Sequence, residues 1–162
     1  MAATSSSTMT VAKTGEREIV ITREFDAPRA LVFRAMTDPA VIPLWWGPAR
    51  YTTTIDKLDA RPGGAWRFVQ KGPDGEFGFR GVFKEIVPPQ RVVMTFEWEG
   101  LPGHISVNTL VLEERGGRTF MTSTSTFDSR EDRDGMVQSG MESGARETDD
   151  RLAAVLAELK NS

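Results

Sequence analysis

The chain has 162 residues, of which 39% are hydrophobic and 27% charged, as in an ordinary globular domain. Its net charge of −3 argues against a general nucleic-acid binder and against a polybasic membrane-surface protein, because both need a basic face. The absence of cysteine and the single histidine, His104, exclude disulfides, thiolate nucleophiles and two-histidine metal sites, so we expect no metal and no other cofactor.

The N-terminal segment, residues 1–16, is rich in Ala, Ser and Thr and lacks the apolar and basic regions of a secretory signal. We expect a disordered tail there, followed by a single domain over residues 17–162. No apolar run approaches the roughly 20 residues that cross a bilayer. The expected compartment is therefore the cytoplasm, without membrane insertion.

A strand and two short helices are predicted first. Residues 17–25 alternate in polarity and are rich in β-branched side chains, which is typical of a strand. Asp26 and Pro28 are start signals for a helix. Asp38 and Pro39 repeat this signal for a second helix, and Pro43 limits its length.

The middle of the chain predicts an antiparallel meander, because short runs of strand pattern are separated by Gly and Pro turns. The expected strands are residues 51–61, 65–71, 76–87, 90–99, 105–115 and 118–127.

The C-terminal segment predicts one long helix. Ser129 and Asp132 have the spacing of a capping box, and apolar residues then recur at three- and four-residue steps from Val137 to Leu159. About 30 residues make a helix roughly 45 Å long. The predicted fold class is α+β, a curved antiparallel sheet of about six to seven strands around a long C-terminal helix, with two short helices after the first strand.

Large apolar side chains share faces of several predicted strands, and the final helix opposite them is rich in glycine. This pattern indicates either plain core packing or a pocket between sheet and helix. Two adjacent tryptophans, Trp45 and Trp46, are not expected to point into one core, so one should face a cavity mouth or a partner. The candidate pocket residues are Trp46, Trp66, Phe68, Phe79, Phe83, Phe96, Trp98, Met136, Gly140 and Met141.

Few polar residues are candidates for chemistry. Gln70, Asn108 and Ser123 are the neutral side chains expected to reach the interior, where they could orient a ligand. His104 follows a Pro-Gly loop, where it is either a general base or a surface residue. We assign no catalytic residue.

An ordered set of motifs resembles the bacterial stand-alone proteins related to the C-terminal domain of the Hsp90 ATPase activator, in the START-like or SRPBCC superfamily. The motifs are residues 23–28 (REFDAP), 37–39 (TDP), 45–48 (WWGP), 61–64 (RPGG) with Trp66, 72–75 (GPDG), and Gly81 followed by residues 85–86 (EI) and 88–91 (PPQR). The last helix lacks a Trp that many relatives carry. Met136, Gly140, Met141 and Gly144 stand there instead, which implies a wider or softer pocket.

The resemblance implies a helix-grip fold, in which the sheet holds the C-terminal helix and leaves a pocket. It leaves three functions open, because one fold hosts many activities. The first is binding of a small hydrophobic or amphipathic molecule. The second is an enzyme of the cyclase, dehydratase or hydrolase type that uses the same pocket. The third is interaction with an Hsp90-type chaperone, which an exposed apolar patch around Trp45 would favour. The chain is expected to be a monomer or a homodimer.

Overall fold

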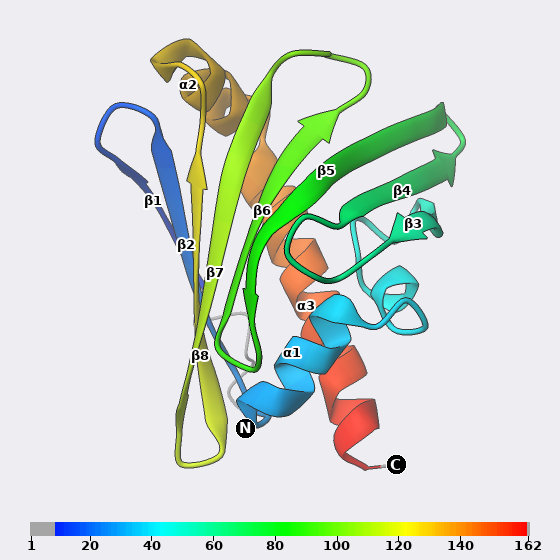
Figure 1. Ribbon diagram of the computed structural model, residues 1–162, viewed down its shortest axis with the longest axis vertical. Coiled ribbons are helices and arrows are strands. Elements are labelled where there is room, and N and C mark those ends of the chain that lie inside the picture. The colour runs from blue at the N-terminus through cyan, green and yellow to red at the C-terminus, as the bar shows by residue number, and fades with distance from the viewer. Residues whose placement is uncertain (1–8, 162) are drawn as a thin grey trace.

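The computed structural model describes residues 9–161 and contains one antiparallel sheet with helices on its concave side (Figure 1). The sheet has eight strands in the order β1-β2-β8-β7-β6-β5-β4-β3, so the N-terminal hairpin pairs with the last strand. The strands are β1 Thr10–Thr14, β2 Glu18–Phe25, β3 Thr52–Leu58, β4 Ala65–Gly72, β5 Gly75–Val87, β6 Arg91–Trp98, β7 Ile105–Arg115 and β8 Arg118–Thr126.

Four helical segments complete the fold. They are α1 Arg29–Thr37, the 3₁₀ turn η2 Ile42–Leu44, α2 Arg130–Gln138 and α3 Met141–Lys160. In Figure 1, α3 runs behind the strands and α1 lies beside it. This arrangement confirms the predicted helix-grip α+β fold, with one strand more than expected.

The extra strand is β1. Residues 10–14 fall in the segment predicted as a disordered tail, but they pair with β2 from Thr10 opposite Thr22 to Thr14 opposite Glu18. The prediction failed here because five largely polar residues carry little hydrophobic periodicity, whereas pairing to the β2 edge satisfies their backbone groups. The remainder of the predicted tail, residues 1–8, lies outside the described residues.

The predicted second helix is shorter than expected. Asp38 does not begin an α-helix; its carboxylate accepts from the Ala40 N–H at 2.9 Å and forms a local turn. Helical structure resumes only as the three-residue 3₁₀ turn Ile42–Leu44, which contains Pro43.

The predicted single C-terminal helix is interrupted. Ser129 caps α2 as expected, because its hydroxyl accepts from the Asp132 N–H at 3.0 Å. The helix then ends, and Gly140 adopts a left-handed conformation with φ of 84° before α3 begins. One apolar stripe therefore extends over two helices instead of one.

The core lies between the concave face of the sheet, α1 and α3. Leu152, Val155 and Leu156 of α3 are buried against inward side chains of the sheet such as Phe25 and Leu112. At the N-terminus of α2, the buried Arg133 guanidinium donates to backbone carbonyls of the β1–β2 turn. No helix among the described residues is long and apolar enough to cross a membrane.

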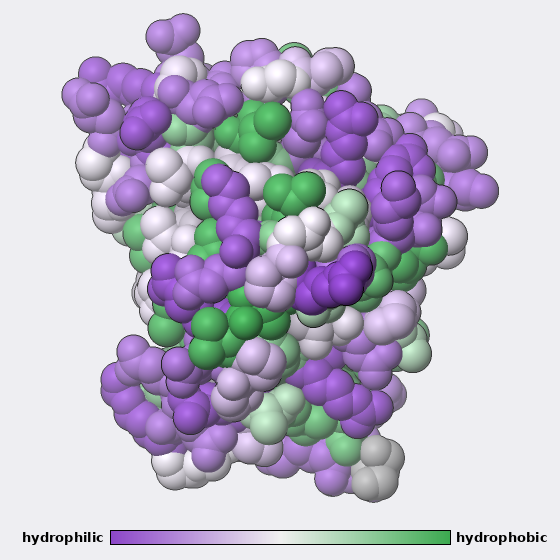
Figure 2. Space-filling view, in the orientation of Figure 1, coloured by the Kyte–Doolittle hydropathy of each residue, from purple (hydrophilic) through white to green (hydrophobic). Residues whose placement is uncertain are grey.

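The outer face of the sheet carries charge between apolar groups. Arg67 pairs with Glu99 at 2.7 Å and Arg80 with Glu97 at 3.0 Å. Val82 is 42% exposed on the same side. Figure 2 shows hydrophobic groups separated by hydrophilic ones on the face turned toward the reader. These charged residues lie on the face of the sheet opposite the inward aromatic side chains.

Candidate functional site

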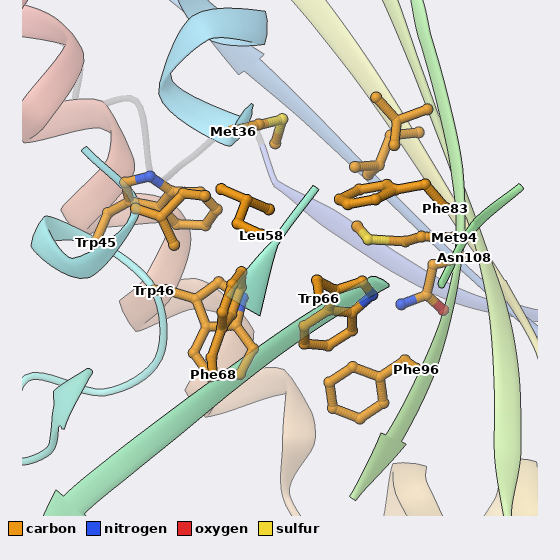
Figure 3. Close-up of a pocket in the computed structure, with 13 residues that line it drawn as sticks. Met36, Trp45, Trp46, Leu58, Trp66, Phe68, Phe83, Met94, Phe96 and Asn108 are labelled. Carbon is orange, nitrogen blue, oxygen red and sulfur yellow. The ribbon is translucent and has the colours of Figure 1, made fainter. Parts of the chain in front are cut away.

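A partly enclosed space of about 170 Å³, here called the inner cavity, lies under strands β3 to β7 (Figure 3). The sheet forms one wall, and α1, η2 and the two residues after η2 form the opposite wall. Its lining residues are Met36, Ile42, Trp45, Trp46, Leu58, Trp66, Phe68, Phe83, Val92, Met94, Phe96, Asn108 and Leu110. None of these residues belongs to α3. The expectation that the long helix would form one wall of the pocket is therefore wrong for this cavity.

Aromatic rings pack against one another along the wall of the inner cavity, edge to face around Trp46 and tilted around Trp66. The Trp46 ring lies 5.2 Å from the rings of both Phe68 and Phe79, centroid to centroid. Trp66 lies 4.8 Å from Phe68 and 6.0 Å from Phe96. Such pairs favour one arrangement over others, so the wall is rigid.

Both adjacent tryptophans line the inner cavity, but only Trp45 belongs to the buried core, whereas Trp46 is half-buried. The Trp45 side chain is buried, and its Nε1 donates to the Ala35 carbonyl of α1 at 2.9 Å. Trp46 turns instead toward Phe68 and Phe79. The two indoles diverge at the end of η2, where the backbone of the capping residue Trp45 leaves the helical region with φ of −133°.

The segment Trp46–Ala49 is fastened by polar contacts on two sides. From the sheet, the Thr53 hydroxyl donates to the Trp46 carbonyl at 3.0 Å. From α3, the Arg151 guanidinium donates to the carbonyls of Gly47 and Leu44, and the Glu147 carboxylate accepts from the Ala49 N–H at 2.8 Å. Helix α3 thus acts on the inner cavity indirectly, by holding the segment that carries Trp46.

Gln70 and Gly47 form a close contact below this segment. The buried Gln70 amide donates to the Trp46 carbonyl and to the Thr53 hydroxyl, each at 3.4 Å. A Cβ at Gly47 would lie 1.9 Å from Gln70 Nε2, and Gly47 has a positive φ of 78°. Only glycine fits both conditions. Gln70 reaches the interior as predicted, but it supports the chain and does not line the cavity.

The Trp66 indole is fixed by a hydrogen bond to the backbone of β6, near an irregularity in the sheet. Its Nε1 donates to the Thr95 carbonyl of β6 at 3.1 Å, across Gly81 of the intervening strand β5. The register of β5 on β6 shifts between Phe83 and Glu85, in the neighbourhood of this contact. The indole therefore satisfies a carbonyl near an irregular part of the ladder, and its ring orientation is fixed.

Asn108 is the one lining residue of the inner cavity with an amide side chain. Figure 3 shows the amide at the cavity wall, near Trp66 and Met94. Its Oδ1 accepts from the Ser106 hydroxyl at 3.4 Å, which leaves its nitrogen as a hydrogen-bond donor. Among the described residues, no Asp, Glu, His, Lys or Arg lines this cavity.

A second space of about 470 Å³, here called the outer chamber, lies between the β6–β7 end of the sheet and α2. Phe96 is the only residue that lines both spaces. The lining of the outer chamber is Phe96, Trp98, Leu101, His104, Ser106, Phe127, Glu131, Asp132, Gly135, Met136 and Ser139.

The ten candidate pocket residues are distributed between the two spaces. Five line the inner cavity: Trp46, Trp66, Phe68, Phe83 and Phe96. Trp98 and Met136 line the outer chamber together with Phe96.

The remaining three candidates line neither space. Phe79 lies behind the inner cavity, where its ring contacts Trp46 and Phe96 at 5.2 and 5.7 Å. Gly140 and Met141 are absent from both walls, because the break between α2 and α3 lies outside them. The sequence analysis missed the wall from α1 to β3, although Met36 and Leu58 are apolar residues of predicted elements.

One buried carboxylate lies outside both spaces. Burial raises the pKa of Asp149 on α3 to about 6, against the opposing effect of the Arg23 guanidinium. Arg23 itself is buried on β2 and donates to Asp150 at 3.2 Å. This ion cluster joins β2 to α3. Among residues 9–161, no three His, Asp or Glu side chains converge as metal ligands would.

The sequence matches the family model described as Activator of Hsp90 ATPase homolog 1-like protein over residues 26–157. A comparison with curated proteins gave no match.

Several solved bacterial structures are similar along the whole chain. A protein from Arthrobacter aurescens is 32% identical, with a TM-score of 0.84 and coverage of 92% of this chain and 91% of the other. A protein from Staphylococcus epidermidis is 26% identical, with a TM-score of 0.81 and coverage of 93% and 94%. A protein from Rhodobacter sphaeroides is 24% identical, with a TM-score of 0.86 and coverage of 93% and 99%, and it supports the fold alone.

Proposed function

Because the chain belongs to the family of Activator of Hsp90 ATPase homolog 1-like proteins, whose fold is compatible with a ligand-binding domain, we propose that it binds a small apolar molecule in the inner cavity. The observation that carries this proposal is a partly enclosed space of about 170 Å³ beside the core, walled by aromatic and aliphatic groups. An engineered cavity of about 150 Å³ with an apolar lining stays dry and binds benzene. The ligand, or the end of it that enters, is therefore about one ring in size.

The polarity of the cavity lining restricts the chemical class of the ligand further. A charged group would lose its hydration there without a counter-charge, so the bound part is neutral. The Asn108 nitrogen favours a ring that carries one oxygen acceptor, such as a phenol or a ketone.

The other two functions have less support. An enzyme of the cyclase, dehydratase or hydrolase type needs a group for proton transfer, and no ionisable side chain of the described residues lines the inner cavity. An exposed apolar patch around Trp45 would favour a role with an Hsp90-type chaperone; Trp45 itself is only 8% exposed, although the adjacent Leu44 is 54% exposed. Neither observation favours these functions over binding.

The test uses toluene and p-cresol as neutral probes of one-ring size. Both should raise the melting temperature and shift the NMR signals of the Met36 and Met94 methyl groups, since a ligand of the folded state stabilises it. The phenol should bind more tightly than toluene, and Asn108→Leu should remove that preference. If neither probe shifts these methyl groups, the proposal is wrong.

Two variants of Leu110 change the cavity volume in opposite directions. Leu110→Phe should fill the cavity and abolish toluene binding, whereas Leu44→Phe, the same change at a 54% exposed position, should not. Leu110→Ala should enlarge the cavity and admit naphthalene, at a cost of about 2–5 kcal/mol in stability. Toluene binding that is the same in all three variants would contradict the proposed location.

A further inference from the structure

The outer chamber contains a histidine–aspartate pair. His104 Nδ1 lies 2.9 and 3.0 Å from the two carboxylate oxygens of Asp132. A carboxylate only accepts hydrogen bonds, so Nδ1 carries the hydrogen, and in the neutral ring Nε2 then presents a lone pair. The pair joins the β6–β7 loop to the first turn of α2, and it offers the chamber acceptors instead of donors.

The hydroxyl groups of the two serines that line the chamber already donate hydrogen bonds within the protein. The Ser106 hydroxyl donates to Asn108 Oδ1 at 3.4 Å. The Ser139 hydroxyl donates to the Met136 carbonyl at 2.6 Å. What each hydroxyl has left is a lone pair, so these groups too are acceptors toward a ligand.

The charge of the lining has one sign. Glu131 and Asp132 contribute two carboxylates, and no Lys or Arg of the described residues lines the chamber. A metal ion would need three His, Asp or Glu side chains that converge on one point, and among residues 9–161 no such group exists, Glu131, Asp132 and His104 included. An organic cation that donates hydrogen bonds fits both the charge and the acceptors.

The rest of the lining is apolar and in part exposed. Trp98 is 40% exposed, Leu101 50% and Met136 36%, and Phe96 and Phe127 line the same space. Covering such groups is favourable, and a thioether adapts to the shape of its contact. The face of an exposed indole also attracts a cation.

We infer that the outer chamber is a second binding site, specific for hydrophobic amines. The apolar body of the ligand packs on Trp98, Leu101 and Met136, and its protonated nitrogen donates to the acceptors of Glu131, Asp132 and His104. The site does not require that the inner cavity be occupied, because Phe96 is the only residue that the two linings share.

The experiment compares three probes with the same apolar body: 3-phenylpropylamine, 3-phenylpropanol and 3-phenylpropanoate. By calorimetry at neutral pH and low salt, the amine should bind on the order of tenfold more tightly than the alcohol, and the acid most weakly. Only the amine should also shift the NMR signals of the Trp98 indole N–H and the Met136 methyl group at low probe concentration.

A double variant, Glu131→Gln with Asp132→Asn, keeps the shape of the chamber and removes its charge. It should reduce amine affinity to that of the alcohol and leave alcohol affinity unchanged. Glu131→Gln alone provides the same test, with a smaller reduction, in a protein that keeps the pair with His104. Glu158→Gln, which removes an exposed charge of α3 remote from the chamber, should have no effect.

Equal affinity for amine and alcohol, or an amine preference that survives the double variant, would overturn this inference. Failure of the inner cavity would be recognised separately, because toluene would then leave the Met36 and Met94 signals unchanged while the amine still shifted those of Trp98 and Met136.

Discussion

At Gly81 the backbone of β5 passes beneath the Trp66 indole, and the absence of a side chain is what permits the contact with Thr95. A Cβ at this position would lie 2.0 Å from the Thr95 carbonyl oxygen and 2.6 Å from Trp66 Nε1. The first neighbour is backbone and cannot move without separating β5 from β6. The orientation of the Trp66 ring in the wall of the inner cavity thus depends on the absence of a side chain at Gly81.

We therefore expect Gly81→Ala to lower the free energy of unfolding by about 1–3 kcal/mol, as overpacking does elsewhere, and to weaken toluene binding. Equilibrium urea unfolding measures the first effect. The matched control is Gly144→Ala on α3, where a Cβ would meet nothing within 4 Å. That variant should be up to about 1 kcal/mol more stable than the natural protein, because alanine favours a helix. Unchanged stability of Gly81→Ala would contradict this prediction, because it would show that β5 and β6 can move apart at this point without a cost in free energy.

Among the elements, α3 has two separate tasks. Its apolar side packs Leu152, Val155 and Leu156 into the core. Its polar side holds the Trp46–Ala49 segment through Glu147 and Arg151. Through these polar contacts, the position of Trp46 in the wall of the inner cavity depends on α3, although α3 itself does not line the cavity.

Arg151→Met should loosen that segment. The variant keeps much of the aliphatic length but leaves the carbonyls of Gly47 and Leu44 without their charged donor, which should cost about 1–3 kcal/mol. Hydrogen exchange of the backbone amides in residues 44–49 should accelerate, and toluene should dissociate faster.

The control for Arg151 lies on the same helix. Arg146 pairs with Glu142 one turn away, and its side chain is 39% exposed, so Arg146→Met should change stability by less than about 0.5 kcal/mol. Equal exchange rates at residues 44–49 in the two variants would contradict the proposed role of Arg151.

The elements also show what the sequence could predict. The strand β5 was expected at residues 76–87 and is found at Gly75–Val87, because alternating side chains and Gly-Pro turns encode a strand locally. The break at Gly140 was not predicted, because the apolar spacing continues through it from Val137 to Leu159. Periodicity reports which side of a helix is buried, but it does not report whether the axis is continuous.

At the scale of the whole molecule, the fold was predictable and the shape of the site was not. The inward faces of β4, β5 and β6 were identified correctly, since they follow from alternation along each strand. The opposite wall depends on how α1 and η2 dock against the sheet, and that is decided by tertiary packing. Met36 and Trp45 were missed for this reason, while Gly140 and Met141 were assigned to a pocket that they do not reach.

The free energy of unfolding should vary with pH because of the titration of Asp149. Its folded-state pKa of about 6 lies above the ordinary value of 3.8, because burial disfavours the charged form. The folded state then binds the proton more tightly, so this group stabilises the fold below about pH 4 and loses that contribution as the pH rises toward 6.

Asp149→Asn removes this titration. Relative to the natural protein, the variant should gain on the order of 1–3 kcal/mol in stability between about pH 4 and pH 6.5. Urea unfolding at several pH values measures the difference, and Glu158→Gln should show no comparable trend. A constant difference between variant and natural protein over this range would mean that Asp149 does not titrate there.

The positions of the indoles give the molecule built-in optical probes. Trp45, Trp46 and Trp66 line the inner cavity, and Trp98 lines the outer chamber, so all four tryptophans of the chain face one of the two spaces. Emission from the buried Trp45 and Trp66 should be blue-shifted relative to that of Trp98, which is 40% exposed. Occupation of either space can therefore be followed by intrinsic fluorescence, without a label, and the emission wavelength indicates which space has been filled.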